Sequence, residues 1–282
     1  MRIVTFQNGN QGPRVGLLEA DAVTELAAPS TLAWLAGHGH DRTGAEHALA
    51  DVELLSPLPV PASYRDFMTF ESHARRTFSA VLDDPEHQVP AYWYEAPSFY
   101  FGNHFAFVGP GQPVTHPEGV EWLDLELEVA GVIGGDGEIA AFTLLNDWSA
   151  RDVQRRESGV GLGLHKSKDF TNSIGPWLVT PDEVGYENGR MRVEAEVELN
   201  GETIIRTSNE DQYFTWDQMV AHAGRNTRLP AGSVLGSGTL PGGSLIENGA
   251  VESGRWLQPG DVVTLRATGL GELTNEIVAR GA

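Results

Sequence analysis

The sequence contains no cysteine among its 282 residues. Disulfides, thiolate nucleophiles and cysteine-based zinc or iron–sulfur sites are therefore excluded. No apolar run approaches the roughly 20 residues that span a bilayer. The first residues, MRIVTFQNGNQG, also lack the charged-then-apolar pattern of a signal peptide. We therefore expect a cytoplasmic protein with no membrane partner.

Positive charge is also scarce. The chain has 19 Lys and Arg against 39 Asp and Glu, which gives a formal net charge of -20. A field of this sign repels nucleic acid and anionic membrane surfaces, so we expect neither as a partner. An anionic substrate would need a local cationic pocket, which makes the positions of the few basic residues informative.

The order of patterns along the chain predicts two domains. A stiff proline-rich connector at residues 56–61, SPLPVP, separates a small N-terminal α/β domain at residues 1–58 from a larger domain at residues 62–282. In the first domain we expect strands at 2–6 and 14–18 and short helices at 29–36 and 44–50. In the second, glycine is dense and apolar strand-like runs recur, with helices predicted only at 71–82, 149–157 and 215–222. The fold class is therefore α+β and rich in β-strand.

Residues 123–129 carry the most informative pattern. Their sequence, LDLELEV, places Asp124, Glu126 and Glu128 on one face of a predicted strand and apolar side chains on the other. Burying unpaired like charges costs several kcal/mol or more per ion, and a bound cation removes that cost. An ordinary edge strand with its acidic face in water explains this segment equally well.

Two further acidic signals favour the cation. Asp147 follows a predicted strand at 139–145, at the junction with a short helix whose start, Ser149 with Asp152, is typical of a capping box. Upstream, Asp66 is followed seven residues later by His73, at the head of a predicted helix. Oxygen ligands without cysteine or clustered histidine suit Mg²⁺, Mn²⁺ or Ca²⁺ better than Zn²⁺. No EF-hand, HExxH, P-loop or GxSxG motif occurs.

Several of these residues lie in motifs that resemble the fumarylacetoacetate hydrolase family. The resemblance covers roughly residues 64–277. In chain order the motifs are Asp66 with His73, ELE at 126–128, NDWSARD at 146–152, Lys168 before GPW at 175–177, GSGT at 236–239 and WLQPGD at 256–261. Any one of them could arise by chance, but their occurrence together and in this order is specific.

The resemblance implies a fold, a metal site and an activity. The fold would be a mixed β-sandwich roll behind the small N-terminal domain, assembled as a homodimer. The metal, Mg²⁺ or else Mn²⁺ with Ca²⁺ possible, would be held by Asp66, Glu126, Glu128 and Asp147. His73 would be the general base. The activity would be hydrolysis of a carbon–carbon bond in a β-diketo acid of the fumarylacetoacetate or acylpyruvate type, in the catabolism of aromatic compounds.

The resemblance implies roles for further residues as well. Glu247 matches the glutamate that orients the base, and Lys168 and Arg151 match groups that bind substrate or the developing oxyanion. Substrate contacts fall on Tyr100, Gln154, Thr239 and Met68. Met68 stands where the enzymes that cleave fumarylacetoacetate have tyrosine, so that substrate does not follow. In the acylpyruvase-like members a glutamate lies three residues after the histidine, whereas this chain has Arg76, so Glu247 must supply the acidic partner.

One alternative stays within the same fold, because a metal-bound enolate also serves decarboxylases, isomerases and dehydratases of 2-keto acids. The presence of both His73 and Glu247 favours hydrolysis, since only hydrolysis needs a base that activates water. A non-catalytic metal-binding protein is a second alternative. The intact set of ligands, base and cationic groups argues against it.

Overall fold

The structure is a computed structural model and describes residues 1–281. Residue 282, the last of the second predicted domain, lies outside the described residues. The N-terminal elements are β1 (Arg2–Gln7), β2 (Arg14–Glu19), β3 (Ala22–Leu26), α1 (Thr31–Leu35), β4 (Arg42–Ala48), the 3₁₀ turn η1 (Leu49–Asp51) and β5 (Glu53–Leu55).

The remaining elements follow the proline-rich connector. They are β6 (Ser63–Phe67), α2 (Glu71–Leu82), η2 (Ala91–Tyr94), β7 (Phe99–Phe101), β8 (Phe107–Val108), β9 (Val114–Thr115), β10 (Leu123–Asp124), β11 (Leu127–Ile133), β12 (Ile139–Asn146), β13 (Ser149–Ala150), α3 (Arg151–Ser158), β14 (Asn172–Val179), η3 (Pro181–Val184), β15 (Glu194–Leu199), β16 (Glu202–Ser208), α4 (Trp216–Gly224), β17 (Ser233–Gly236), η4 (Ile246–Asn248), α5 (Ala250–Ser253), β18 (Val262–Ala267) and β19 (Gly271–Val278).

Two packed sheets form the body of the molecule. The larger has 12 strands within residues 1–281, and its main path runs β4-β3-β2-β1-β14-β12-β11-β17-β6-β7. The second has the order β16-β15-β18-β19-β9. Strands β12 and β14 lie against β18 and β19, and apolar side chains of both sheets join one core cluster. The structure is thus a β-rich sandwich with few helices, which confirms the predicted fold class.

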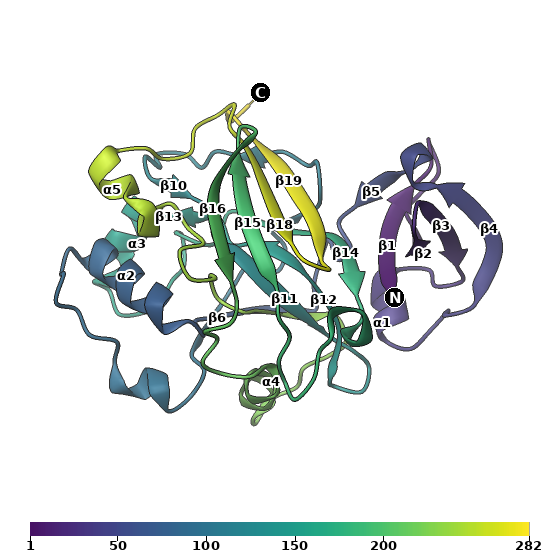
Figure 1. The fold of residues 1–282 in the computed structure, drawn as a ribbon, viewed down its shortest axis with the longest axis horizontal. Coiled ribbons are helices and arrows are strands. Elements are labelled where there is room, and N and C mark those ends of the chain that lie inside the picture. The colour runs from purple at the N-terminus through teal and green to yellow at the C-terminus, as the bar shows by residue number, and fades with distance from the viewer. Residues whose placement is uncertain (282) are drawn as a thin grey trace.

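The small N-terminal unit extends the larger sheet. Strand β1 pairs with β2 along one edge, and with β14 and β5 one after the other along the opposite edge, in the register Arg2↔Val179 and Thr5↔Leu55. Figure 1 shows this unit at one side of the molecule, with helices α2, α3 and α5 at the opposite side. The domain boundary at the proline-rich connector stays a prediction.

Strand alternation in β11 decides which side chains reach the site. Leu127 and Val129 belong to the core between the sheets, while Ala130 and Val132 join a second apolar cluster on the other face of the larger sheet. Glu128 therefore shares that other face, because successive side chains of a strand point to opposite sides. Tyr64 of β6 and Val234 of β17 lie in the same second cluster.

Local structure differs from the sequence-based expectation at three places. The helix predicted at 44–50 is wrong: residues 42–48 form β4, because pairing with β3 at the sheet edge outweighs the helix propensity of an alanine-rich segment. The strand predicted at 123–129 is divided, since β10 pairs with β13 whereas β11 pairs with β12 and β17. Helix α3 begins without the predicted capping box, because the Ser149 hydroxyl donates to the Asp147 carbonyl instead.

The other two long helices agree with the ranges predicted from the sequence. Helix α2 spans the predicted residues, and α4 begins after Thr215 with a complete capping box in which Gln218 takes part. Within residues 1–281 no helix is long and apolar enough to cross a membrane.

Truncation of Leu127 should destabilise the fold strongly. Its side chain is fully buried in the core between the sheets, so Leu127→Ala should lower the free energy of unfolding by about 2–5 kcal/mol. Leu162→Ala is the matched control, because Leu162 is 82% exposed. Urea unfolding of both variants measures the difference, and equal stability of the two would contradict the placement of β11 in the core.

Candidate active site

Three carboxylates from different segments of the chain meet on one face of the larger sheet. Asp66 lies on β6, Glu128 on β11, and Asp147 in the link between β12 and β13. One oxygen atom from each can be chosen so that all three lie within 4.8 Å of one another, and all three residues are buried. Strands β6 and β11 reach this point because each pairs with β17, which lies between them.

Gly236 of β17 leaves the space in which these carboxylates approach. It pairs with Asp66 on one side and with Ala130 on the other. A methyl group added at Gly236 would lie 2.1 Å from Oδ1 of Asp66 and 2.9 Å from Oε2 of Glu128. Any residue larger than glycine would therefore occupy the space that the two carboxylates share.

The three carboxylates are short of counter-charge. Burial, followed by the charge of Asp147, raises the pKa of Asp66 well above its usual range. Burial and the charge of Asp66 do the same to the pKa of Glu128. The pKa of Asp147 is also raised by burial, against the opposing effect of Lys168. Oδ1 of Asp66 and Oδ1 of Asp147 are buried without any hydrogen-bond partner. A divalent cation would satisfy both oxygens and offset the repulsion.

Glu126, the fourth predicted ligand, lies beside this group but is engaged by two cations. Its Oε1 accepts from Arg151 Nη2 at 2.7 Å, and its Oε2 accepts from Lys168 Nζ. Burial opposes ionisation of Glu126, yet the charges of Arg151 and Lys168 hold its pKa below the usual range. The Lys168 ammonium also donates to Oδ2 of Asp147 at 2.5 Å. Lys168 therefore joins Glu126 to the three-carboxylate group.

Asp124 connects the carboxylate group to the base. One of its oxygens accepts from Arg151 Nε at 2.8 Å, and its carboxylate also accepts from the backbone N–H groups of Leu245 and Ile246. These two residues immediately precede Glu247. Asp124 thus fixes Arg151 and the segment that carries Glu247 at the same time.

His73 and Glu247 form a hydrogen-bonded pair. Nδ1 of His73, in the first turns of α2, lies 2.8 Å from Oε2 of Glu247. Glu247 also accepts from the Gly242 N–H at 3.0 Å and from the Ser244 hydroxyl at 2.8 Å, which fixes its orientation. Because an ionised Glu247 can only accept, Nδ1 of His73 must be the donor. Nε2 is then left as an acceptor when the ring is neutral, 3.5 Å from Oε1 of Glu126.

A cavity of about 550 Å³ opens onto this group. His73, Lys168, Asp66, Glu126 and Glu128 contribute to its wall, and so do all four predicted substrate-contacting residues, Tyr100, Gln154, Thr239 and Met68. The Tyr100 hydroxyl donates to Oδ2 of Asp147 at 2.7 Å, and the Thr239 hydroxyl lies 3.3 Å from Oε1 of Glu128. Arg151 is not part of the wall. It lies behind Glu126 and holds Gln154 at 3.0 Å.

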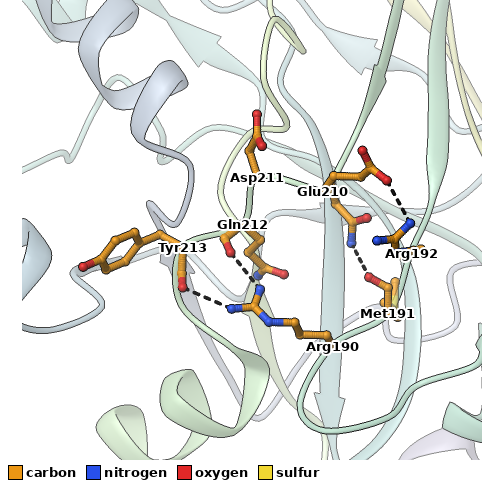
Figure 2. A pocket seen from close by; sticks show the side chains of 8 residues that line it. Arg190, Met191, Arg192, Glu210, Asp211, Gln212 and Tyr213 are labelled. Atoms are coloured by element: carbon orange, nitrogen blue, oxygen red, sulfur yellow. Dashed lines mark hydrogen bonds and ion pairs between the residues drawn. The ribbon is translucent and has the colours of Figure 1, made fainter.

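A second hollow, of about 390 Å³, contains none of these residues. It is lined by residues 190–192, which precede β15, and by the loop after β16 (Figure 2). Arg190 donates to the carbonyls of Gln212 and Tyr213 at 2.8 and 3.4 Å, and Arg192 pairs with Glu210 at 3.0 Å. These contacts hold the loop that leads into α4.

The sequence of the chain matches a known family over most of its length. The fumarylacetoacetate (FAA) hydrolase C-terminal family matches residues 62–278, which is more than half of the chain. The chain belongs to the fumarylacetoacetate hydrolase family. A second family, described as Rv2993c-like, N-terminal, matches residues 1–57.

Individual members of the fumarylacetoacetate hydrolase family show the range of the likeness. Fumarylacetoacetase of Arabidopsis thaliana is 28% identical over 247 residues, which cover 69% of this chain and 58% of that protein. Oxaloacetate tautomerase YisK of Bacillus subtilis (strain 168) is 30% identical, over 68% of this chain and 64% of that protein. The chain thus spans less than two thirds of the length of either relative.

A solved structure of the family shares the whole fold. Fumarylacetoacetate hydrolase from Exiguobacterium antarcticum has a TM-score of 0.77 and 22% sequence identity, and the match covers 99% of this chain and 100% of that one. The small N-terminal unit is therefore included in the structural likeness, together with the sandwich.

The sequence motifs indicated most of the polar side chains of the site. They did not indicate the glycines and apolar residues that determine its shape. Gly236 was part of a motif, yet no sequence signal indicated that it lies between two carboxylates. The backbone N–H of Gly238 donates to Oε2 of Glu128 at 3.1 Å, which also required the structure. The apolar cavity residues Phe78, Val81 and Leu164 were indistinguishable from ordinary core or surface positions.

Gly236→Ala should abolish metal binding while leaving the fold intact. The new methyl group would occupy the space between Asp66 and Glu128, and the backbone of Gly236 is not in a conformation that requires glycine. Wild-type protein should gain about 2.7 kcal/mol of stability when Mn²⁺ is present at 100 times its Kd, and the variant should gain almost none. Thermal unfolding with and without Mn²⁺ provides the measurement.

Gly12→Ala is the matched control, since nothing lies within 4 Å of a methyl group at that position. It should keep the full stabilisation by Mn²⁺. If the Gly236→Ala protein binds Mn²⁺ as tightly as wild type, the cation does not lie between Asp66 and Glu128.

Proposed function

We propose that this chain is a metal-dependent hydrolase that cleaves a carbon–carbon bond in a β-diketo acid of the acylpyruvate or fumarylacetoacetate type. The observation that carries the proposal is the pair of His73 and Glu247 beside a cluster of carboxylates at the wall of one cavity. A histidine fixed through one ring nitrogen is the usual form of a general base that activates water.

The residues present fit a hard divalent cation. Asp66, Glu128 and Asp147 would hold it, and Glu126 would join them as the fourth ligand if Lys168 moved aside. When bound, the cation would supply Lewis acidity that polarises the substrate carbonyl groups and stabilises enolate charge. We propose Mg²⁺ as the natural ion, with Mn²⁺ as a substitute.

The chain's own residues would divide the remaining work. Nε2 of His73 takes a proton from water, and Glu247 stabilises the resulting imidazolium through Nδ1. The water oxygen bonds to the acyl carbonyl carbon, while Lys168 stabilises the negative charge on the carbonyl oxygen. The carbon–carbon bond then breaks, and its electron pair becomes that of the pyruvate enolate. The proton held by His73 passes to the enolate carbon, which yields a carboxylic acid and pyruvate.

Arg151 would act as a positioning residue in this scheme. It lies outside the cavity wall and binds Asp124, Glu126 and Gln154 through separate nitrogen atoms. Tyr100 and Thr239 would orient Asp147 and Glu128 as well as contact substrate. We further propose a homodimer and a place in the catabolism of aromatic compounds, as the family resemblance implies. The cytoplasmic location stays a prediction.

A second candidate function is isomerisation or decarboxylation of a 2-keto acid. It is favoured by the likeness to oxaloacetate tautomerase YisK at 30% identity. The same His73 could then take a proton from carbon instead of water, or be unnecessary for decarboxylation.

Removal of the base should separate these functions. With Mg²⁺ and an acylpyruvate, His73→Gln should lower kcat by about 10²–10⁴-fold. Glu247→Gln should cause a smaller loss, because the ring would keep a partner but lose the charge that stabilises the imidazolium. Pyruvate release, followed by a coupled assay, measures both.

The matched control is His38→Gln, because His38 lies on the surface of the N-terminal unit, and it should retain wild-type kcat. Full hydrolysis by His73→Gln would refute the proposed role of the base. Turnover of oxaloacetate by wild type, with no pyruvate released from any acylpyruvate, would favour the second candidate.

A further inference from the structure

The cavity has two chemically distinct ends. The inner end carries the carboxylates, Lys168 and His73. The outer end, called here the apolar arm, is lined by Met68, Phe78, Val81, Leu82, Trp93 and Leu164. A group of the substrate that points away from the metal ligands can lie against these side chains.

Helix α2 sets the length of the apolar arm. His73, Thr77 and Val81 follow one another at intervals of four residues, so they share one face of the helix, and all three line the cavity. Val81 is eight positions after His73, which corresponds to about 12 Å along the helix axis. An acyl group that extends several carbons from the reacting carbonyl would therefore run along this face.

The apolar arm offers no permanent cation. Among residues 1–281, Lys168 is the one lysine or arginine in the cavity wall, and its ammonium already donates to Glu126 and Asp147. The arginines of α2 and the exposed arginines of α3 lie outside the wall: Arg75, Arg76, Arg155 and Arg156. Arg75 is bound to Glu71 at 2.6 Å and Arg155 to Asp83 at 2.9 Å. A carboxylate buried in the arm would have no permanent cation as a partner, which disfavours its burial.

The backbone of two helices adds a negative electrostatic potential, which also disfavours a carboxylate. Val81 and Leu82 belong to the last turn of α2, and Ser158 is the final residue of α3; all three line the cavity. The C-terminal end of a helix carries partial negative charge on its unpaired carbonyls. Both helices therefore present to the outer end of the cavity the pole that disfavours an anion.

His87 also lines the cavity, beside the apolar arm. Its ring packs against Phe78, with centroids 5.5 Å apart, and its Nδ1 lies 3.8 Å from Oδ2 of Asp84. An incoming carboxylate would share this histidine with Asp84. The hydroxyls of Thr77 and Ser158 are also engaged, with His73 and with the Gln154 carbonyl.

We propose that the substrate's acyl group is uncharged and apolar, an alkyl or aryl group, rather than a chain that ends in a second carboxylate. This inference rests on the proposed hydrolase function, because that function places the acyl group in the apolar arm. It divides acylpyruvates into two classes that can be compared directly.

Two acylpyruvates of equal acyl-chain length provide the test. Hexanoylpyruvate ends in a methyl group and adipoylpyruvate ends in a carboxylate. With Mg²⁺, wild-type kcat/KM should be at least about tenfold higher for hexanoylpyruvate, because the second carboxylate would be buried without a partner. Equal or faster cleavage of adipoylpyruvate would overturn the proposal.

A charge introduced into the apolar arm should reverse the preference. Leu82 is 42% exposed, so Leu82→Arg can be accommodated at the mouth of the cavity. It should shift the ratio of the two kcat/KM values toward adipoylpyruvate by about tenfold. Leu162→Arg adds the same charge outside the cavity wall and should leave the ratio at its wild-type value. Equal shifts in both variants would assign the effect to net charge and contradict the proposal.

Binding separates this inference from the proposed function. Calorimetry with the His73→Gln protein and Mg²⁺ measures the affinity for each compound without turnover. If wild type releases pyruvate from neither compound but hexanoylpyruvate binds more tightly, the proposed hydrolase function is wrong. The proposed preference for an apolar group is then still supported. If adipoylpyruvate binds as tightly or more tightly, or if neither compound binds, the proposed preference for an apolar group is refuted.

Discussion

Mutual repulsion among buried carboxylates is the constraint on which the rest of the site depends. Asp66, Glu128 and Asp147 lie with oxygen atoms within 4.8 Å of one another, away from water. Such an arrangement is costly without a counter-ion, because burial and mutual repulsion raise the pKa of all three carboxyl groups. The fold tolerates it because each carboxylate is attached to a rigid strand or strand end, and because Gly236 leaves the space between two of them open.

Around these three carboxylates, basic and acidic side chains alternate along a chain of hydrogen bonds. Lys168 links Asp147 to Glu126, Arg151 links Glu126 to Asp124, and Asp124 holds the backbone just before Glu247. Each contact positions the next, so the acidic centre and the base on α2 are parts of one network. Five carboxylates, Asp66, Asp124, Glu126, Glu128 and Asp147, face two permanent cations, Arg151 and Lys168. One divalent cation would reduce this excess of negative charge.

The sequence predicted the fold class and most of the chemical groups, because each left a local signature. Alternation at 123–129 indicated which residues share a face, and the helix predicted at 215–222 agrees with α4 to within two residues. What the sequence did not predict depends on contacts between distant segments. Residues 44–50 became β4 because β3 pairs with them, and the strand at 123–129 divided because its two halves have different partners. The position of Arg151 behind Glu126, rather than on the cavity wall, likewise follows from packing that no local pattern encodes.

The most direct test of this account is the position of a bound cation. A crystal of the protein grown with Mn²⁺, measured for anomalous scattering, would locate the ion without reference to activity. One strong peak is expected, in contact with oxygen atoms of Asp66, Glu128 and Asp147 together. A peak bound by other residues, or the absence of any peak among these three carboxylates at saturating Mn²⁺, would contradict it.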